Sequence, residues 1–225
     1  LYDPSFEHDA CGIGFVVNIK GKKSYDIIDD ALTILENLKH RGAEGADAKS
    51  GDGAGILVQI PHQFFCRECE VLGFSLPEEG EYGVGMIFAH RYESFRKKQM
   101  EAFEKIVRSE GLTILGWRDV PVDESLIGSI AKTIRPHFLQ VFIKKSPDLE
   151  TQMDFERKLY IIRKLAEKAI VPPSQEKGTD FYIASLSSRT IVYKGMLTSV
   201  QLRHFYLDLS DLDFTTAMAL VHSRF

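Results

Sequence analysis

The thiol of Cys11 is the first group in the sequence that could act as a nucleophile. Cys11 begins the apolar run Cys-Gly-Ile-Gly-Phe-Val-Val-Asn-Ile, and the glycines beside it would let backbone approach a ligand closely. A thiol attacks as the thiolate and needs a base, and an unblocked α-amine with a pKa of roughly 7.7 to 8.0 would serve. The other interpretation is a buried structural cysteine, which is a frequent environment for a free thiol.

The other two cysteines form a Cys-x-x-Cys pair. Cys66 and Cys69 enclose two charged residues, and His62 lies one helical turn before Cys66. A structural zinc site takes four ligands, and the chain has no second pair of cysteines. The pair also lacks the sequence context of a thioredoxin-like motif. We therefore expect no metal site and no redox site here.

A glycine-rich segment covers residues 42–53 and leads into the apolar run at 54–60. Loops that hold phosphate precede a helix, whereas this pattern predicts a strand, and no Gly-Lys-Ser/Thr is present. The glycines instead indicate a tight loop on the substrate side of a site.

Two arginines follow apolar elements. Arg41 and Arg224 could each bind a carboxylate through the forked donors of the guanidinium. The alternative is that both are solvated surface residues.

Composition places the chain among ordinary globular proteins. Its 225 residues are 44% hydrophobic and 27% charged, and the formal net charge of −4 gives no positive field for nucleic acid or an anionic membrane. No apolar run approaches the roughly 18 to 20 residues of a membrane span. Three cysteines cannot build a disulfide framework. We expect a cytoplasmic protein without nucleic-acid or membrane partners.

Strand and helix patterns alternate and predict an α+β protein. The predicted strands cover 11–19, 54–60, 82–89, 112–120, 138–144, 181–186, 190–193 and a β-rich segment at 215–222. The predicted helices cover 24–38, 61–73, 92–109, 124–133 and 148–170, and a further helix opens at 198–201.

Several boundaries carry more specific expectations. Ser24 is a fair N-cap, and Gly73 suits the position after a helix end. Residues 187–189 predict a turn that pairs the strands on either side, residues 198–201 form a capping box, and 171–180 is the one convincing linker. The chain starts at Leu rather than Met and stops just after an apolar element, so we expect a fragment cut inside a domain.

Taken together, the motifs closely resemble the N-terminal glutaminase domain of glutamate synthase large subunits. The matching blocks, in that family's order, are residues 11–15, 40–43, 50–57, 60–65, 182–197 and 219–225. Residues 1–4 resemble the family's short propeptide. The resemblance divides the chain into a propeptide-like segment at 1–10 and a class II glutamine amidotransferase domain at 11–225.

The resemblance implies a four-layer αββα N-terminal-nucleophile hydrolase sandwich, truncated at its C-terminal end. It implies that Cys11 attacks glutamine with its own α-amine as base, and that Arg41 and Gly42 orient the nucleophile. Arg224 would bind the α-carboxylate of glutamine, with Phe225 beside it. Ammonia would feed reductive amination of 2-oxoglutarate in flavin-containing domains of the same polypeptide, which would hold FMN and an iron–sulfur cluster; this chain would hold no cofactor.

Two departures from the family pattern bear on activity. Ten residues precede Cys11, so its nitrogen is an amide and cannot act as a base. The Asn-Gly pair of the family's oxyanion hole is absent and would lie beyond residue 225. We expect a fragment that is inactive and self-associates. The alternatives are a non-catalytic regulatory or interaction module with the same fold, and the glutaminase domain of another class II amidotransferase.

Overall fold

The computed structural model describes residues 12–41, 51–170 and 181–223. Its strands are β1 (Gly12–Val17), β2 (Ala54–Gln59), β3 (Tyr82–Ala89), β4 (Thr113–Asp119), β5 (His137–Lys144), β6 (Tyr182–Ser187), β7 (Thr190–Gly195) and β8 (Met218–Ser223). Its α-helices are α1 (Asp26–Asn37), α2 (His62–Val71), α3 (Glu93–Ser109), α4 (Ser129–Ile134), α5 (Gln152–Ile170) and α6 (Gln201–Phe205). Two short 3-10 helices are η2 (Leu38–Arg41) and η3 (Leu207–Ser210).

The strands form two antiparallel sheets. The first sheet has the order β1-β8-β2-β7, and the second has the order β4-β5-β3-β6. The first sheet therefore joins the first and the last strand of the described chain as neighbours. β7 contacts both β3 and β6, which brings the two sheets together.

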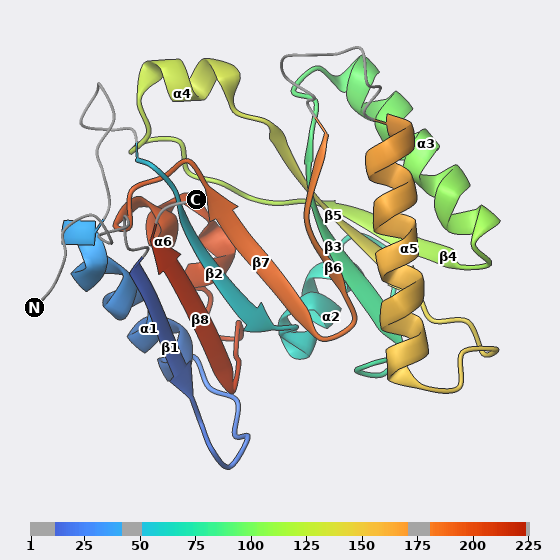
Figure 1. The fold of residues 1–225 in the computed structure, drawn as a ribbon, viewed down its shortest axis with the longest axis horizontal. Helices are drawn as coiled ribbons and strands as arrows, with labels where there is room; N and C mark the ends of the chain where they lie inside the picture. Colours follow the sequence, from blue (N-terminus) through green and yellow to red (C-terminus); the bar gives the residue numbers. More distant parts are fainter. Residues whose placement is uncertain (1–11, 42–50, 171–180, 224–225) are drawn as a thin grey trace, which may run out of the picture.

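Helices pack on one face of each sheet. Figure 1 shows α1 beside the first sheet and α3 with α5 beside the second sheet. α1 contacts β1, β8 and β2, whereas α5 packs on β6 and α3 packs on β4. The two antiparallel sheets with their helices confirm the expected α+β class and are consistent with a sandwich. Within the described residues, no helix is long and apolar enough to cross a membrane.

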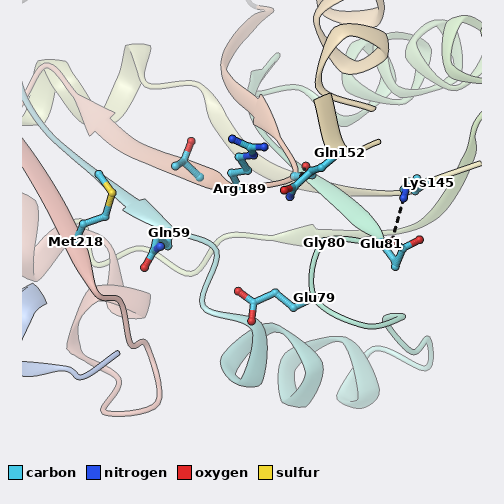
Figure 2. Close-up of a pocket in the computed structure, with 10 residues that line it drawn as sticks. Gln59, Glu79, Gly80, Glu81, Lys145, Gln152, Arg189 and Met218 are labelled. Carbon is cyan, nitrogen blue, oxygen red and sulfur yellow. Dashed lines mark hydrogen bonds and ion pairs between the residues drawn. The ribbon is translucent and has the colours of Figure 1, made fainter. Parts of the chain in front are cut away.

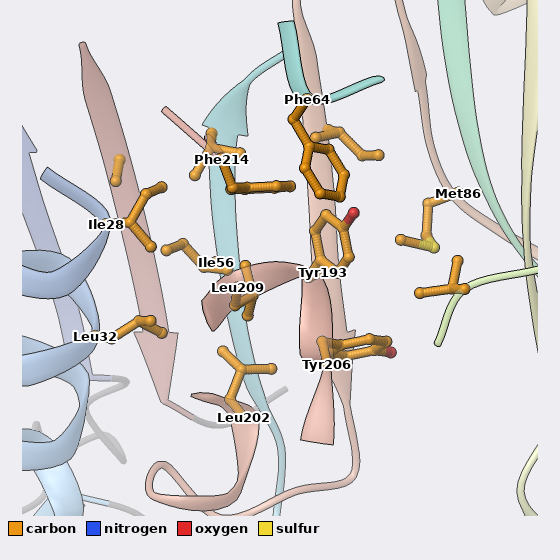
Figure 3. Close-up of a cluster of buried hydrophobic side chains, with 14 of the residues drawn as sticks. Ile28, Leu32, Ile56, Phe64, Met86, Tyr193, Leu202, Tyr206, Leu209 and Phe214 are labelled. Carbon is orange, nitrogen blue, oxygen red and sulfur yellow. The ribbon is translucent and has the colours of Figure 1, made fainter. Parts of the chain in front are cut away.

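Two hydrophobic clusters stabilise these layers. The larger joins α1, the first sheet and the inner face of the second sheet, and Figure 3 shows Ile28, Ile56 and Tyr193 within it. The smaller lies between the second sheet and the helices α3 and α5. Burial of apolar area contributes roughly 25 cal/mol per Å². The clusters thus hold both sheets in fixed relative positions.

One face of the first sheet is apolar and open to solvent. Phe15, Leu220, Leu57 and Val192 are successive cross-strand partners over β1, β8, β2 and β7. The side chain of Phe15 is 54% exposed and that of Leu220 is 37% exposed. This row lies on the face opposite Gly14, which packs against α1.

The expected hairpin at residues 187–189 is wrong. β6 pairs with β3 in the second sheet, whereas β7 pairs with β2 in the first. The chain changes sheets at this turn because Glu156 of α5 accepts the backbone N–H of Ser188 at 2.5 Å and its hydroxyl at 2.6 Å. The turn is thereby fastened to a helix rather than closed by its own two strands.

Smaller corrections concern helix ends. Tyr25, not Ser24, is the N-cap of α1, and Ser24 instead forms an isolated bridge with Thr216. The helix expected at 124–133 is α4, which begins only at Ser129. Gly73 has a φ of 86° just after the C-cap of α2, as expected. The linker expected at 171–180 lies outside the described residues.

Half of the expected capping box is present. The Gln201 amide oxygen accepts the backbone N–H of Thr198 at 2.9 Å. α6 nevertheless begins at Gln201, with Val200 as its N-cap.

Candidate functional site

Four strand ends of the first sheet meet at one edge, which we call the functional edge. Gly12 pairs with Ser223, Ser223 also pairs with Ala54, and Ala54 pairs with Gly195. Directly opposed residues in an antiparallel pair have Cα atoms about 4.5 to 5.5 Å apart. The functional edge thus gathers the start of β1, the end of β8, the start of β2 and the end of β7.

The candidate residues adjoin the functional edge through chain connectivity. Cys11 precedes Gly12, and Arg224 and Phe225 follow Ser223. Consecutive Cα atoms are about 3.8 Å apart, so the chain leads into this edge at the nucleophile and leaves it at Arg224. Cys11, Gly42, Arg224 and Phe225 themselves lie outside the described residues.

Arg41 reaches the same part of the molecule by another path. Arg41 is the last residue of η2, which contacts both β1 and β8. Ile34 in the last part of α1 lies against Gly14, where an added Cβ would come within 2.3 Å of the Ile34 Cγ2 atom. Only the backbone of Arg41 is described. The close approach of α1 directs η2 toward the strand end that follows Cys11.

Gly51 fixes the end of the glycine-rich segment. A Cβ atom at Gly51 would lie 2.4 Å from the backbone carbonyl of Leu197 and 2.4 Å from the Thr198 nitrogen. Backbone cannot move aside as a side chain does, so only glycine fits. This contact supports the interpretation of a closely packed loop beside the functional edge.

A buried tyrosine holds the end of β7. The Tyr206 hydroxyl donates to the backbone carbonyl of Lys194 at 2.8 Å, one residue before Gly195. Burial, assisted by the negative charge of Asp208, raises the pKa of Tyr206. The hydroxyl therefore remains a hydrogen-bond donor across the physiological pH range.

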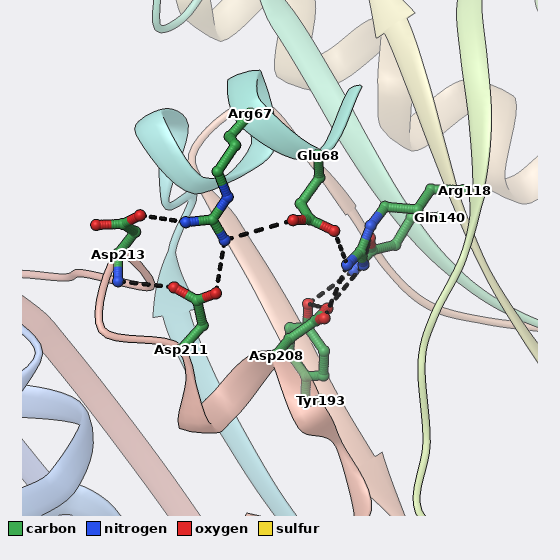
Figure 4. Close-up of polar contacts among 8 residues, drawn as sticks. All are labelled: Arg67, Glu68, Arg118, Gln140, Tyr193, Asp208, Asp211 and Asp213. Carbon is green, nitrogen blue, oxygen red and sulfur yellow. Dashed lines mark hydrogen bonds and ion pairs between the residues drawn. The ribbon is translucent and has the colours of Figure 1, made fainter. Parts of the chain in front are cut away.

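A buried ion pair lies behind the first sheet. Arg118 of β4 donates to both carboxylate oxygens of Asp208, at 2.8 and 2.9 Å, and Arg118 is only 4% exposed. Asp208 also accepts the Tyr193 hydroxyl at 2.7 Å, and Gln140 accepts from Arg118 at 2.9 Å. Figure 4 shows this network continuing through Glu68 toward the surface.

The Arg118 network joins elements of both sheets with η3. Burial alone would lower the pKa of Arg118, but the hydrogen bonds and charge of Asp208 outweigh burial and raise it. Sequence reasoning missed this network because its members lie far apart in the chain. The only local signal is a charged residue inside an otherwise apolar element, as at Asp208 between Leu207 and Leu209.

The Cys-x-x-Cys pair is not organised for nucleophilic chemistry. The Cys66 sulfur lies 3.5 Å from Nε2 of His62, and His62 Nδ1 contacts the Tyr82 hydroxyl at 3.0 Å. Burial raises the pKa of Cys66, and it raises the pKa of the fully buried Cys69 to about 12. Thiols in this state are poor nucleophiles near neutral pH. In the described part of the chain, no group of three or more His, Cys, Asp or Glu residues could hold a metal ion.

Comparison with known proteins identifies the family. The profile of the class-II glutamine amidotransferases matches residues 11–225. The chain is 52% identical over 225 residues to the glutamate synthase [NADPH] large chain of Bacillus subtilis, covering all of this chain and 14% of that protein. It is 43% identical over 230 residues to the glutamate synthase [NADH] of Schizosaccharomyces pombe, covering all of this chain and 11% of that protein.

A third relative is named for ferredoxin rather than for NADPH or NADH. The chain is 41% identical over 225 residues to the ferredoxin-dependent glutamate synthase 2 of Arabidopsis thaliana, again over its whole length and 14% of that protein. The chain therefore spans only a small part of the curated relatives it matches. With the family profile covering residues 11–225, the chain belongs to the class-II glutamine amidotransferases.

Proposed function

We propose that this chain is the glutaminase domain of a glutamate synthase. Relatives with that name align over the entire chain, including forms named for NADPH, NADH and ferredoxin. The proposed reaction hydrolyses the side-chain amide of glutamine to glutamate and ammonia. Because the relatives are much longer, the proposal extends to further domains of the same polypeptide that use the ammonia.

The proposed chemistry is nucleophilic catalysis by the thiol of Cys11. Once residues 1–10 are removed, the free α-amine takes the thiol proton, and the thiolate attacks the amide carbon of glutamine. Ammonia leaves with a proton returned by the same amine, and a γ-glutamyl thioester remains. Water then attacks the thioester, which releases glutamate and restores the thiol.

The remaining candidate residues bind and orient the substrate. Arg224 binds the α-carboxylate of glutamine through two parallel hydrogen bonds, and Phe225 lies beside it. Arg41 and Gly42 orient the end of the chain that carries the nucleophile. Holding both reactants in place converts a bimolecular step into an effectively unimolecular one.

One observation carries the proposal: the pairing of Gly12 with Ser223 in the ladder between β1 and β8. These two residues adjoin the proposed nucleophile and the proposed carboxylate-binding arginine in the sequence. A substrate with a carboxylate at one end and an amide at the other can then contact both. The close packing of Gly51 against residues 197–198 supports a substrate loop at the same edge.

In the proposed parent protein, the ammonia enters reductive amination of 2-oxoglutarate. FMN and an iron–sulfur cluster would lie in the other domains of the polypeptide, and we propose no cofactor for this chain. A cytoplasmic location agrees with the composition, and no helix among the described residues could span a membrane.

The proposal is tested by measuring glutaminase turnover of the full-length protein with Cys11→Ser and Cys66→Ser. Cys11→Ser is expected to lower kcat by about 10³-fold or more, because the hydroxyl is a much weaker nucleophile here. Cys66→Ser is the matched control, since Cys66 is a half-buried thiol on α2 away from the functional edge, and it should stay within about twofold of wild type. Activity retained by Cys11→Ser would contradict the proposal and favour a non-catalytic role for residues 11–225.

A further inference from the structure

A polar cavity of about 700 Å³ lies at the other end of the first sheet from the functional edge. Gln59, Thr190 and Met218 line it, and they are at or next to the ends of β2, β7 and β8 that point away from Ala54, Gly195 and Ser223. A strand rises about 3.3 Å per residue, so the six-residue strands separate the two places by roughly 17 Å. The cavity is thus separate from the proposed glutaminase site, and its size suits a small metabolite.

One cation of this cavity has no ion-pair partner among the described residues. Glu81 pairs with Lys145 at 3.0 Å, and Glu79 pairs with Lys23, so both carboxylates of the lining already have a cation. Arg189 also lines the cavity and has no ion-pair partner among the described residues. Arg189 is therefore the cation of the lining that a ligand carboxylate could pair with.

Hydrogen-bonding groups of both kinds face the same space. Gln59 uses its amide oxygen to accept the backbone N–H of Ala217 at 3.0 Å, which leaves the amide nitrogen as a donor. Gln152 donates to the Ser188 hydroxyl at 3.3 Å, which leaves its amide oxygen as an acceptor. Figure 2 shows Gln59, Gln152, Glu79 and Arg189 around one open space.

The loop that carries Arg189 is held in place before any ligand binds. Glu156 accepts the Ser188 backbone N–H and the hydroxyls of Ser187 and Ser188, and the Ser187 hydroxyl accepts the Arg189 backbone N–H at 3.0 Å. A loop ordered in advance costs less conformational entropy on binding.

From this cavity we infer a second binding site that takes an α-amino acid. The Arg189 guanidinium binds a ligand carboxylate through its forked donors, and the Gln59 amide nitrogen donates to it. The ligand ammonium donates to the Gln152 amide oxygen and approaches the Glu79 carboxylate, which has a second oxygen beside the one that Lys23 contacts. An α-amino acid carries a carboxylate and an ammonium on one carbon atom, so it offers a group to each of these partners. A phosphate dianion would bring excess charge close to Glu79 and Glu81.

The choice of L-glutamate as the probe rests on the proposed function, because glutamate is the proposed product. The experiment follows backbone amide resonances of the 225-residue chain during titration with L-glutamate, and it needs no turnover. The expected result is saturable shifts at Gln59, Gly80 and residues 188–190. Shifts confined to Gly12, Ser223 and Ala54 would place the ligand at the functional edge and overturn the inference.

Substitutions separate specific binding from bulk charge effects. Arg189→Gln is expected to weaken binding by about tenfold or more, since a charge-assisted hydrogen bond is lost. Gln59→Glu keeps the acceptor for Ala217 but removes the donor, and it should weaken binding similarly. Arg157→Gln is the matched control, because Arg157 is an exposed arginine on α5 that pairs with Asp154. It should leave the affinity within about twofold of wild type.

Three results would overturn the inference. These are the absence of saturable shifts at the cavity, equal affinity in Arg189→Gln with dispersed native resonances, and equal affinity for phosphate or for glutarate, which lacks the ammonium. The Cys11→Ser chain should bind as wild type does. The chain can therefore bind L-glutamate at the cavity even if the protein shows no glutaminase turnover. Failure of the binding inference and failure of the proposed function are thus distinguishable.

Discussion

Gly12 and Ser223 are cross-strand partners in the first sheet, although they come from opposite ends of the described chain. The pairing means that the candidate nucleophile and the candidate substrate-binding arginine adjoin the same pair of residues. No short-range motif can achieve this, because it requires the last strand to insert between β1 and β2. The functional edge is thus a product of sheet topology.

Gly51→Ala is expected to impair catalysis more than global stability. The added Cβ would meet the backbone of Leu197 and Thr198 at 2.4 Å, so the glycine-rich segment must shift. A displacement of about 1 Å near a reacting group can cost about 10²-fold in rate. The measurement is glutaminase kcat/KM of the full-length protein. Gly195→Ala is the milder control, because its Cβ would meet only the Leu197 side chain, at 3.3 Å. Wild-type kcat/KM in Gly51→Ala would contradict the proposed role of this contact.

Arg118→Met is expected to destabilise the fold strongly. It leaves the Asp208 carboxylate, which is 2% exposed, without its cation, and removal of one member of a buried pair typically costs about 3 to 5 kcal/mol. Urea unfolding of the 225-residue chain measures the loss. Arg67→Met is the control, since the exposed Arg67 pairs with Asp211 and Asp213 and should cost about 1 kcal/mol or less. Similar losses of unfolding free energy in both variants would show that burial of the Arg118–Asp208 pair does not determine its contribution to stability.

Alkaline pH is expected to lower the free energy of unfolding. Burial raises the pKa of Cys69 from 9.0 to about 12, so the folded protein keeps this proton while the unfolded chain loses it above about pH 9. The unfolded state then binds fewer protons, and stability falls by up to about 1.4 kcal/mol per pH unit for this group. Urea unfolding between pH 8 and pH 10 measures the slope. Cys69→Ala should flatten it, and an unchanged slope would show that Cys69 does not cause the loss.

Helices with a regular apolar period were predictable from the sequence. The apolar period of the first helix predicts one face made of Ile27, Ile28, Ala31, Leu32, Leu35 and Leu38. All of these except Leu38 are buried in α1, whereas Leu38 is half-buried and begins η2. Their spacing is a local property, and the face follows from it directly. The positions of strands were predictable for the same reason. For example, β3 has the bounds expected from the sequence.

Strand partners were not predictable in the same way. The segments around Ser187 and Arg189 have the sequence pattern of a hairpin, yet Glu156 from a distant helix fastens the turn and the two strands join different sheets. The Arg118–Asp208 pair likewise forms over a long sequence separation. At the candidate site, the sequence motifs identified the candidate residues themselves. Only the sheet register shows which of the residues next to them in the chain pair across the strands.

Self-association of the 225-residue chain is expected through the open face of the first sheet. The row of Phe15, Leu220, Leu57 and Val192 exposes apolar area that association would bury. Light scattering should give a mass above that of a monomer, and Phe15→Lys should shift the mass toward the monomer. Tyr160→Lys on α5 is the control, because Tyr160 is also exposed but lies outside this row. A monomeric wild-type chain would contradict the expectation.

The N-terminal residue of the active full-length protein, isolated from its own cells, tests the central claim most directly. Edman sequencing together with intact mass determines whether residues 1–10 have been removed. The proposed mechanism predicts that the active protein begins at Cys11, since only a free α-amine can serve as the base. Glutaminase activity in protein that still carries residues 1–10 would contradict it, because the nitrogen of Cys11 would then be an amide.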